Sequence, residues 1–126
     1  MITEDYVSFE VAKLLKEKGF DWYTYAYYED EDNPNISLRG GKNINWNKTD
    51  FFSKPTHQMA MEWLREVHKL HIAILWDCGA YIGKNSFCYL IDRMDNYEDK
   101  GYNKIGFDSY EEACEAAIKY CLENLI

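Results

Sequence analysis

Apolar residues recur at helical spacing in three segments of the chain, and each segment begins at a residue that favours a helix start. The first segment follows Ser8 and places Val11 and Leu15 on one stripe. Ser8 is a good N-cap because its hydroxyl can accept a hydrogen bond from an amide of the first turn. Gly19 can take the left-handed conformation that ends a helix. The pattern predicts a helix between Ser8 and Gly19, with an earlier start at Thr3 as the alternative.

The second helical segment follows Pro55 and has Thr56 as its N-cap. Its apolar residues fall at positions i, i+3, i+4 and i+7, which lie on one face of a helix (Ala60, Trp63, Leu64 and Val67). A helix is therefore expected to begin at this threonine.

The last segment carries the strongest helical pattern. Ser109 and Glu112 have the spacing of a capping box, in which each side chain accepts a hydrogen bond from a free amide of the first turn. Six apolar residues then form an unbroken stripe (Cys114, Ala117, Ile118, Cys121, Leu122 and Leu125). Glu115 and Lys119 are spaced i, i+4 and are expected to pair on the outer side of the helix. The two cysteines on the stripe are expected to be core residues.

Between the first two helices the pattern changes to that of strands. Residues 20–28 are rich in aromatic side chains, which favour strands. The acidic run that follows, ending in Asn33-Pro34, breaks this strand. Alternating residues from Ile36 to Trp46 then predict a hairpin whose turn is Gly40-Gly41, because glycine tolerates the positive φ of a tight turn.

The region after the second helix predicts two more strands, at residues 71–77 and 86–93, as antiparallel neighbours. A polar loop is expected at residues 95–103, and residues 104–107 can add a short edge strand. The order of elements is then α-β-β-β-α-β-β-(β)-α. It predicts one α+β domain over residues 1–126, with a mainly antiparallel sheet of about five strands and three helices on one face, in two layers.

Composition indicates a folded domain and excludes some classes of binding partner. The chain has 126 residues, 47% of them hydrophobic, which is too apolar for disorder. Its net charge is −8, and residues 92–126 contribute −5 from nine acids and four bases. A negative field repels phosphate backbones and anionic lipids, so we expect no direct nucleic-acid binding and no membrane binding.

The N-terminal residues lack the apolar core of a signal peptide, and nothing approaches the length of a membrane span. We therefore expect a cytoplasmic protein whose four cysteines remain free thiols.

The sequence contains no recognisable metal, catalytic or phosphate site. His68 and His71 lie close to Asp77 and Cys78, but a zinc site needs three or four converging ligands, and no second ligand pair has the right spacing. His71 is also about 20 Å from residue 77 along a strand, too far to activate a cysteine nucleophile. The glycines at 40–41 and 79–83 lack the spacing of a phosphate-binding loop. We expect no cofactor, no metal and no catalytic residue.

An aromatic row is the most credible functional feature. Tyr23, Tyr25 and Tyr27 share one face of the first strand, and Trp46 ends the predicted hairpin beside it. Tyrosine and tryptophan are favoured at interfaces because they offer a large rigid surface with a polar end. These four residues are the candidate protein-binding surface; the alternative is that the row packs beneath the hairpin.

Three stretches together carry a family resemblance: residues 9–20, residues 55–68 and residues 109–126. They resemble a family of small hypothetical proteins encoded by phages, prophages and mobile elements of gut bacteria. The resemblance implies such an origin and a cytoplasmic setting, and it implies no catalytic residue.

The function hypothesis that follows is a non-enzymatic accessory protein that binds another protein, either a host factor or a second copy of itself. One alternative is a DNA mimic that blocks a nucleic-acid-binding protein through its acidic C-terminal third. The other is a small enzyme, which would need a deep pocket with converging polar groups.

Overall fold

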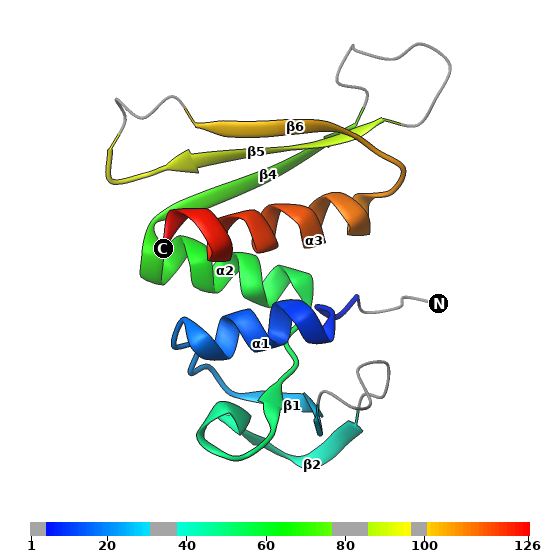
Figure 1. Ribbon diagram of the computed structural model, residues 1–126, viewed down its shortest axis with the longest axis vertical. Helices are drawn as coiled ribbons and strands as arrows, with labels where there is room; N and C mark the ends of the chain where they lie inside the picture. Colours follow the sequence, from blue (N-terminus) through cyan, green and yellow to red (C-terminus); the bar gives the residue numbers. More distant parts are fainter. Residues whose placement is uncertain (1–4, 31–37, 77–85, 97–100) are drawn as a thin grey trace.

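The computed structural model describes residues 5–30, 38–76, 86–96 and 101–126. Three helices lie between two antiparallel sheets (Figure 1). The helices are α1 (Phe9–Glu17), α2 (His57–His68) and α3 (Tyr110–Tyr120), with short helical turns η1 (Trp46–Lys48) and η2 (Cys121–Leu125). None of the helices in these ranges has the length and apolar character needed to cross a bilayer.

Each sheet has three strands. One sheet has the order β2-β1-β3, and the other has the order β4-β5-β6. The strands are β1 (Thr24–Tyr28), β2 (Leu38–Ile44), β3 (Phe52–Ser53), β4 (Leu70–Trp76), β5 (Phe87–Arg93) and β6 (Tyr102–Phe107). The predicted α+β class is confirmed. The strands divide into two sheets, however, so the helices are enclosed between sheets and do not share one face of a single sheet.

The predicted helix starts are confirmed at all three helices. The hydroxyls of Ser8, Thr56 and Ser109 each accept a hydrogen bond from the amide three residues later, at 3.1–3.2 Å. The last cap departs from the expected box in one contact. The carboxylate of Glu112 accepts from the amide of Asp108 at 3.1 Å, one residue before the cap. Gly19 has a φ of +89° after α1, as its position predicted.

The second sheet follows the predicted antiparallel pairing. β4 and β5 are in register over seven consecutive pairs, from Leu70–Arg93 to Trp76–Phe87. β6 begins at Tyr102, inside the segment that was expected to be a loop, because it pairs with β5 over most of its length. Lys69 takes a left-handed conformation with a φ of +58°, which turns α2 directly into β4.

The predicted hairpin turn at Gly40-Gly41 is wrong. Both glycines lie within β2, which pairs with β1. Ala26 is opposite Arg39 and Thr24 is opposite Ile44, so β2 carries extra residues between these two pairs. Glycine in a strand often marks such a bulge, since it has no side chain to hold the ladder regular. The connection from β1 to β2 lies outside the described residues.

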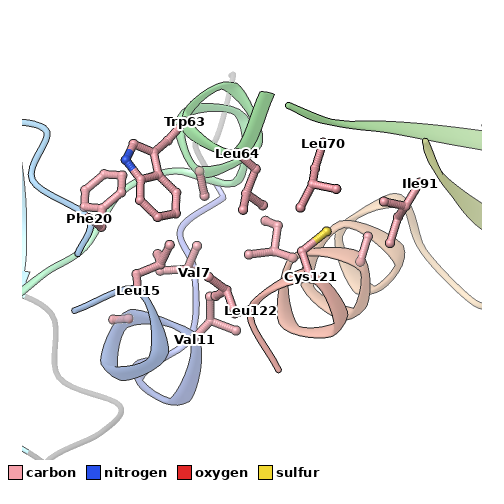
Figure 2. Packing of buried hydrophobic residues seen from close by; sticks show 14 of the residues in the cluster. Val7, Val11, Leu15, Phe20, Trp63, Leu64, Leu70, Ile91, Cys121 and Leu122 are labelled. Atoms are coloured by element: carbon pink, nitrogen blue, oxygen red, sulfur yellow. The ribbon is translucent and has the colours of Figure 1, made fainter. Parts of the chain in front are cut away.

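The core lies among the helices and the inner face of the β4-β5-β6 sheet. Figure 2 shows Val11 and Leu15 of α1 facing Leu64 of α2 and Leu122 of the C-terminal turn. Cys114 and Cys121 are fully buried, as their place on the apolar stripe predicted. The same stripe therefore contacts α1 on one side and the sheet on the other.

Leu64→Ala should lower the free energy of unfolding by about 2–5 kcal/mol, because it opens a cavity where the side chain is fully buried. Leu90→Ala is the matched control: this leucine is 36% exposed on β5, and its truncation should cost about 1 kcal/mol or less. Urea unfolding of both variants measures the difference. Equal losses would contradict the position of the core.

Candidate functional site

A hollow of about 740 Å³ opens where the starts of α1 and α2 meet the first turns of α3. We call it the helix-junction hollow. Its walls combine acidic, basic and aromatic side chains (Asp5, Tyr6, Val7, Ser8, Tyr28, Lys54, His57, Phe107, Glu111, Glu112, Glu115 and Ala116). Its volume is within the range of small-ligand sites, so its chemistry decides what it can do.

The backbone before α1 and the backbone before α2 run antiparallel and bring the two helix starts together. Tyr6 and Thr56 form an isolated bridge. The amide of Val7 donates to the carbonyl of Pro55 at 3.0 Å, and the amide of His57 donates to the carbonyl of Asp5 at 2.9 Å. Each N-cap residue is thus held beside the other helix.

Glu115 of α3 binds both of these helix starts. Its carboxylate accepts the amide of Ser8 at 3.2 and 3.3 Å and lies 2.9 Å from Nε2 of His57. Burial raises the pKa of Glu115, but the hydrogen bonds from His57 and Ser8 outweigh it, and the pKa lies below its ordinary value. The side chain is therefore an anion at neutral pH, in a place where helix N-termini favour negative charge.

Lys54 and Tyr28 form the next part of the wall. The Lys54 ammonium lies 4.5 Å from the ring centre of Tyr6 and 4.9 Å from that of Tyr28, close enough for cation–π attraction. Burial lowers the pKa of Lys54. The Tyr28 hydroxyl donates to the carbonyl of Val7 at 2.7 Å, and burial, with the charge of Glu115, raises the pKa of Tyr28 to about 12.

Two polar side chains of this hollow are held by contacts within the chain. Nε2 of His57 faces Glu115, and its Nδ1 is buried with no hydrogen-bond partner among the described residues. The Tyr28 hydroxyl donates its hydrogen bond to the carbonyl of Val7. Nε2 of the histidine is thus engaged by the carboxylate, and Nδ1 has no access to solvent. The arrangement holds the starts of α1 and α2 against α3.

The sequence pattern missed this junction. Glu115 was expected to pair with Lys119 on the outer side of its helix, and that expectation is wrong. Lys119 pairs with Glu10 at 2.9 Å, and Glu115 turns inward to α1 and α2. The helical spacing places Glu115 one residue after the apolar Cys114, at the border of the stripe. That border position was the one feature of the sequence that could have indicated an inward side chain. The partners of Glu115 come from distant segments, so the sequence pattern could not identify them.

The predicted tyrosine row is most exposed at its first two members. Tyr23 and Tyr25 are 62% and 50% exposed. They border a second hollow of about 240 Å³, which also includes Met59 and shares Tyr6 and Lys54 with the helix-junction hollow. We call Tyr23 and Tyr25 the tyrosine face.

Tyr27 continues the outward side of β1 but is only half-exposed, and Trp46 is buried. Nε1 of Trp46 donates to the carbonyl of Thr24 at 2.7 Å. Tyr27 stacks on Trp46 with ring centres 4.2 Å apart and on Phe51 at 5.0 Å. The expectation that Trp46 belongs to an exposed surface is therefore corrected, because the 3₁₀ turn packs its indole against β1.

The two histidines considered as metal ligands, His68 and His71, have different surroundings. His68 ends α2 and packs its ring edge-on against Trp63, 4.8 Å between ring centres, and burial, with the charge of Lys18, lowers its pKa. His71 is exposed on β4, opposite Asp92. Asp77 and Cys78 lie outside the described residues. Within the described ranges, no three metal-ligating side chains come together.

The expectation that every cysteine is a free thiol is wrong for Cys88. This residue of β5 is disulfide-bonded, with its partner outside the described residues. Cys114 and Cys121 are free and buried, and burial is the largest cause that raises their pKa values, to about 11 and about 12. A thiol with so high a pKa is a poor nucleophile at neutral pH.

Comparison with known proteins places the chain in no family: no family model, curated protein or solved structure matches it. The site therefore has to be interpreted from its own geometry.

Glu115→Gln should lower the free energy of unfolding by about 1.5–3 kcal/mol at pH 7, since hydrogen bonds to a charged group contribute roughly that much. The pKa of Glu115 is lower in the folded chain, so its contribution is complete above the ordinary carboxyl pKa of about 4.3. The contribution is lost as pH falls through the folded pKa, and the difference from wild type should then vanish.

Urea unfolding at a series of pH values measures this difference. Glu111→Gln is the control, because Glu111 is an exposed carboxylate on the same helix. An equal loss in the control, or a difference that does not change with pH, would contradict the role given to Glu115.

Iodoacetamide at pH 8 should leave Cys114 and Cys121 unmodified in the native protein, because both thiols are buried and protonated. Both should react once the chain is unfolded in guanidinium chloride. Peptide mass mapping identifies the labelled residues. Rapid labelling of either cysteine in the native state would show that its part of the core opens.

Proposed function

We propose that this protein is a non-enzymatic accessory protein, of phage or mobile-element origin, that acts by binding another protein through the tyrosine face. The observation that carries the proposal is the exposure of Tyr23 and Tyr25 side by side with a hollow. Two large aromatic side chains left in solvent, one just before β1 and one within it, are typical of interface anchors, which bury their rings on binding while the hydroxyl keeps a polar contact.

The chemistry of the helix-junction hollow supports the non-enzymatic part of the proposal. Its acid and base groups hold each other, as described above for Glu115, His57 and Tyr28. A substrate would have to displace contacts that join three helices. The enzyme alternative is therefore less well supported than the binding alternative.

The acidic-mimic alternative is weakened by the surroundings of α3. Two of its three carboxylates accept hydrogen bonds within the chain: Glu112 from the amide of Asp108, and Glu115 from Ser8 and His57. Lys119 follows on the same helix and pairs with Glu10. A DNA mimic needs a continuous row of free carboxylates, and here the row is interrupted by a base and by internal contacts.

A cytoplasmic setting belongs to the same proposal, and Cys88 is the feature that bears on it. Disulfides are rare in the reducing cytosol, whereas Cys88 is disulfide-bonded. Alkylation in intact host cells before lysis reads the state of this cysteine directly. An oxidised Cys88 in cells would count against the cytoplasmic setting and leave the binding surface unaffected.

Affinity capture from host lysate tests the binding proposal. The tagged wild-type chain should retain one protein in stoichiometric amount, and the double variant Tyr23→Ala/Tyr25→Ala should bind it at least about tenfold more weakly, because truncating an interface anchor costs about 2 kcal/mol. Tyr110→Ala is the matched control, since Tyr110 is exposed but lies at the start of α3.

Circular dichroism of all three proteins checks that they fold. Absence of any stoichiometric partner, or equal loss of the partner in the control, would overturn the assignment of the tyrosine face.

A further inference from the structure

Among the residues that the structure describes, the two sheets have four edge strands, and β4 differs from the other three. β3 has only two residues. β2 and β6 each show a register shift against their neighbour, and β6 also carries Lys104 and a positive-φ Gly106. Bulges, lysines and short length are the features that keep edge strands from pairing with other chains. β4 has seven residues in unbroken register with β5, with no proline, glycine or charged Lys, Arg, Asp or Glu side chain.

The outward backbone groups of β4 can be assigned from its register. The amide of Met94 donates to the carbonyl of Lys69 at 2.8 Å, and Leu70 is opposite Arg93. Hydrogen-bonded and non-hydrogen-bonded pairs alternate along an antiparallel ladder. The residues whose amides and carbonyls point away from β5 are therefore every second one (Leu70, Ile72, Ile74 and Trp76). At the centre of the strand, Ile72 and Ile74 make no outward backbone hydrogen bond within the described ranges.

Exposed apolar side chains occur at the end of β4 and in the helix that precedes it. Trp76 and Leu75 at the end of β4 are 60% and 46% exposed, and Val67 in the last turn of α2 is 50% exposed. The chain as a whole has a net charge of −8, which opposes self-association over most of its surface. β4 carries no acid, so two copies can approach along it without a pair of like charges on the strand itself.

We propose that β4 is a self-association edge, where it pairs antiparallel with β4 of a second copy about a two-fold axis at Ala73. This register places Ile72 opposite Ile74 of the second copy and Leu70 opposite Trp76 of the second copy. All four outward-facing residues then find a partner, and the two β4-β5-β6 sheets join into one sheet of six strands. A shift of two residues would leave outward groups unpaired at both ends.

The residue at the axis favours a second copy over an unrelated strand. Ala73 would face itself in a non-hydrogen-bonded pair, where Cα atoms lie about 4.5 Å apart and side chains are closest. Its methyl group is the smallest side chain in β4. Ile72 and Ile74 flank it symmetrically, and Leu70 and Trp76 are both apolar, while His71 would lie opposite Leu75 of the second copy. The strand can therefore pair with itself, as an isologous interface requires.

Sedimentation or light scattering of the full chain gives the first measurement. Wild type should have twice the chain mass of 15.0 kDa at micromolar and higher concentrations. Ile74→Lys should return the mass to that of one chain, because it places two ammonium groups on the shared edge. A wild type that remains monomeric throughout would overturn the proposal.

Ala73→Cys gives the second measurement and does not depend on the lysine variant folding. Mild oxidation should convert this variant into a covalent dimer that a thiol reductant separates, since the axis brings the two cysteines into a close pair. Asn103→Cys is the matched control, exposed on the opposite edge strand β6, and should remain a single chain. A non-covalent dimer in which Ala73→Cys fails to crosslink, or in which the control crosslinks equally, would place the interface elsewhere and overturn the proposal.

Discussion

The carboxylate of Glu115 is the contact on which the arrangement of the helices depends. It comes from α3, accepts a hydrogen bond from the amide of Ser8 at the N-cap of α1, and lies within hydrogen-bond distance of Nε2 of His57, the first residue of α2. One anion therefore contacts the starts of two helices. Free amides at a helix start require an acceptor, and the same ends carry partial positive charge. The first sheet contacts α1 through β3 and the second contacts α2 and α3, so the junction lies between the two sheets (Figure 1).

The junction also forms part of the wall of the helix-junction hollow. The Glu115 carboxylate already occupies the place where the helix starts would attract an anion. His57 contacts this carboxylate, and the Tyr28 hydroxyl donates a hydrogen bond to the nearby carbonyl of Val7. The helix-junction hollow is thus lined by residues that also hold the helix starts together. The tyrosine face lies on the sheet of β1, and the open edge of β4 lies on the other sheet, so the two proposed contact surfaces are on separate layers and do not compete for residues.

Local features of the sequence were predicted well where the cause is local. Ser8, Thr56 and Ser109 act as helix caps because the acceptor and the amide it satisfies are three residues apart. Predictions that needed a distant partner failed. Glu115 was predicted to pair with Lys119, because helical spacing does not reveal its partners Ser8 and His57. Gly40-Gly41 was predicted to be a turn, because the local sequence does not reveal the bulged register of β2 with β1.

The sequence by itself determined the three helices, most of the strands, the α+β class and the burial of Cys114 and Cys121, since periodicity and caps act over a few residues. Only the tertiary structure decided that the strands form two sheets, that Glu115 turns inward, and that Trp46 is buried while Tyr23 and Tyr25 are exposed. Those outcomes depend on contacts between residues far apart in the chain. Such contacts are set by how complete elements pack, and no single segment encodes them.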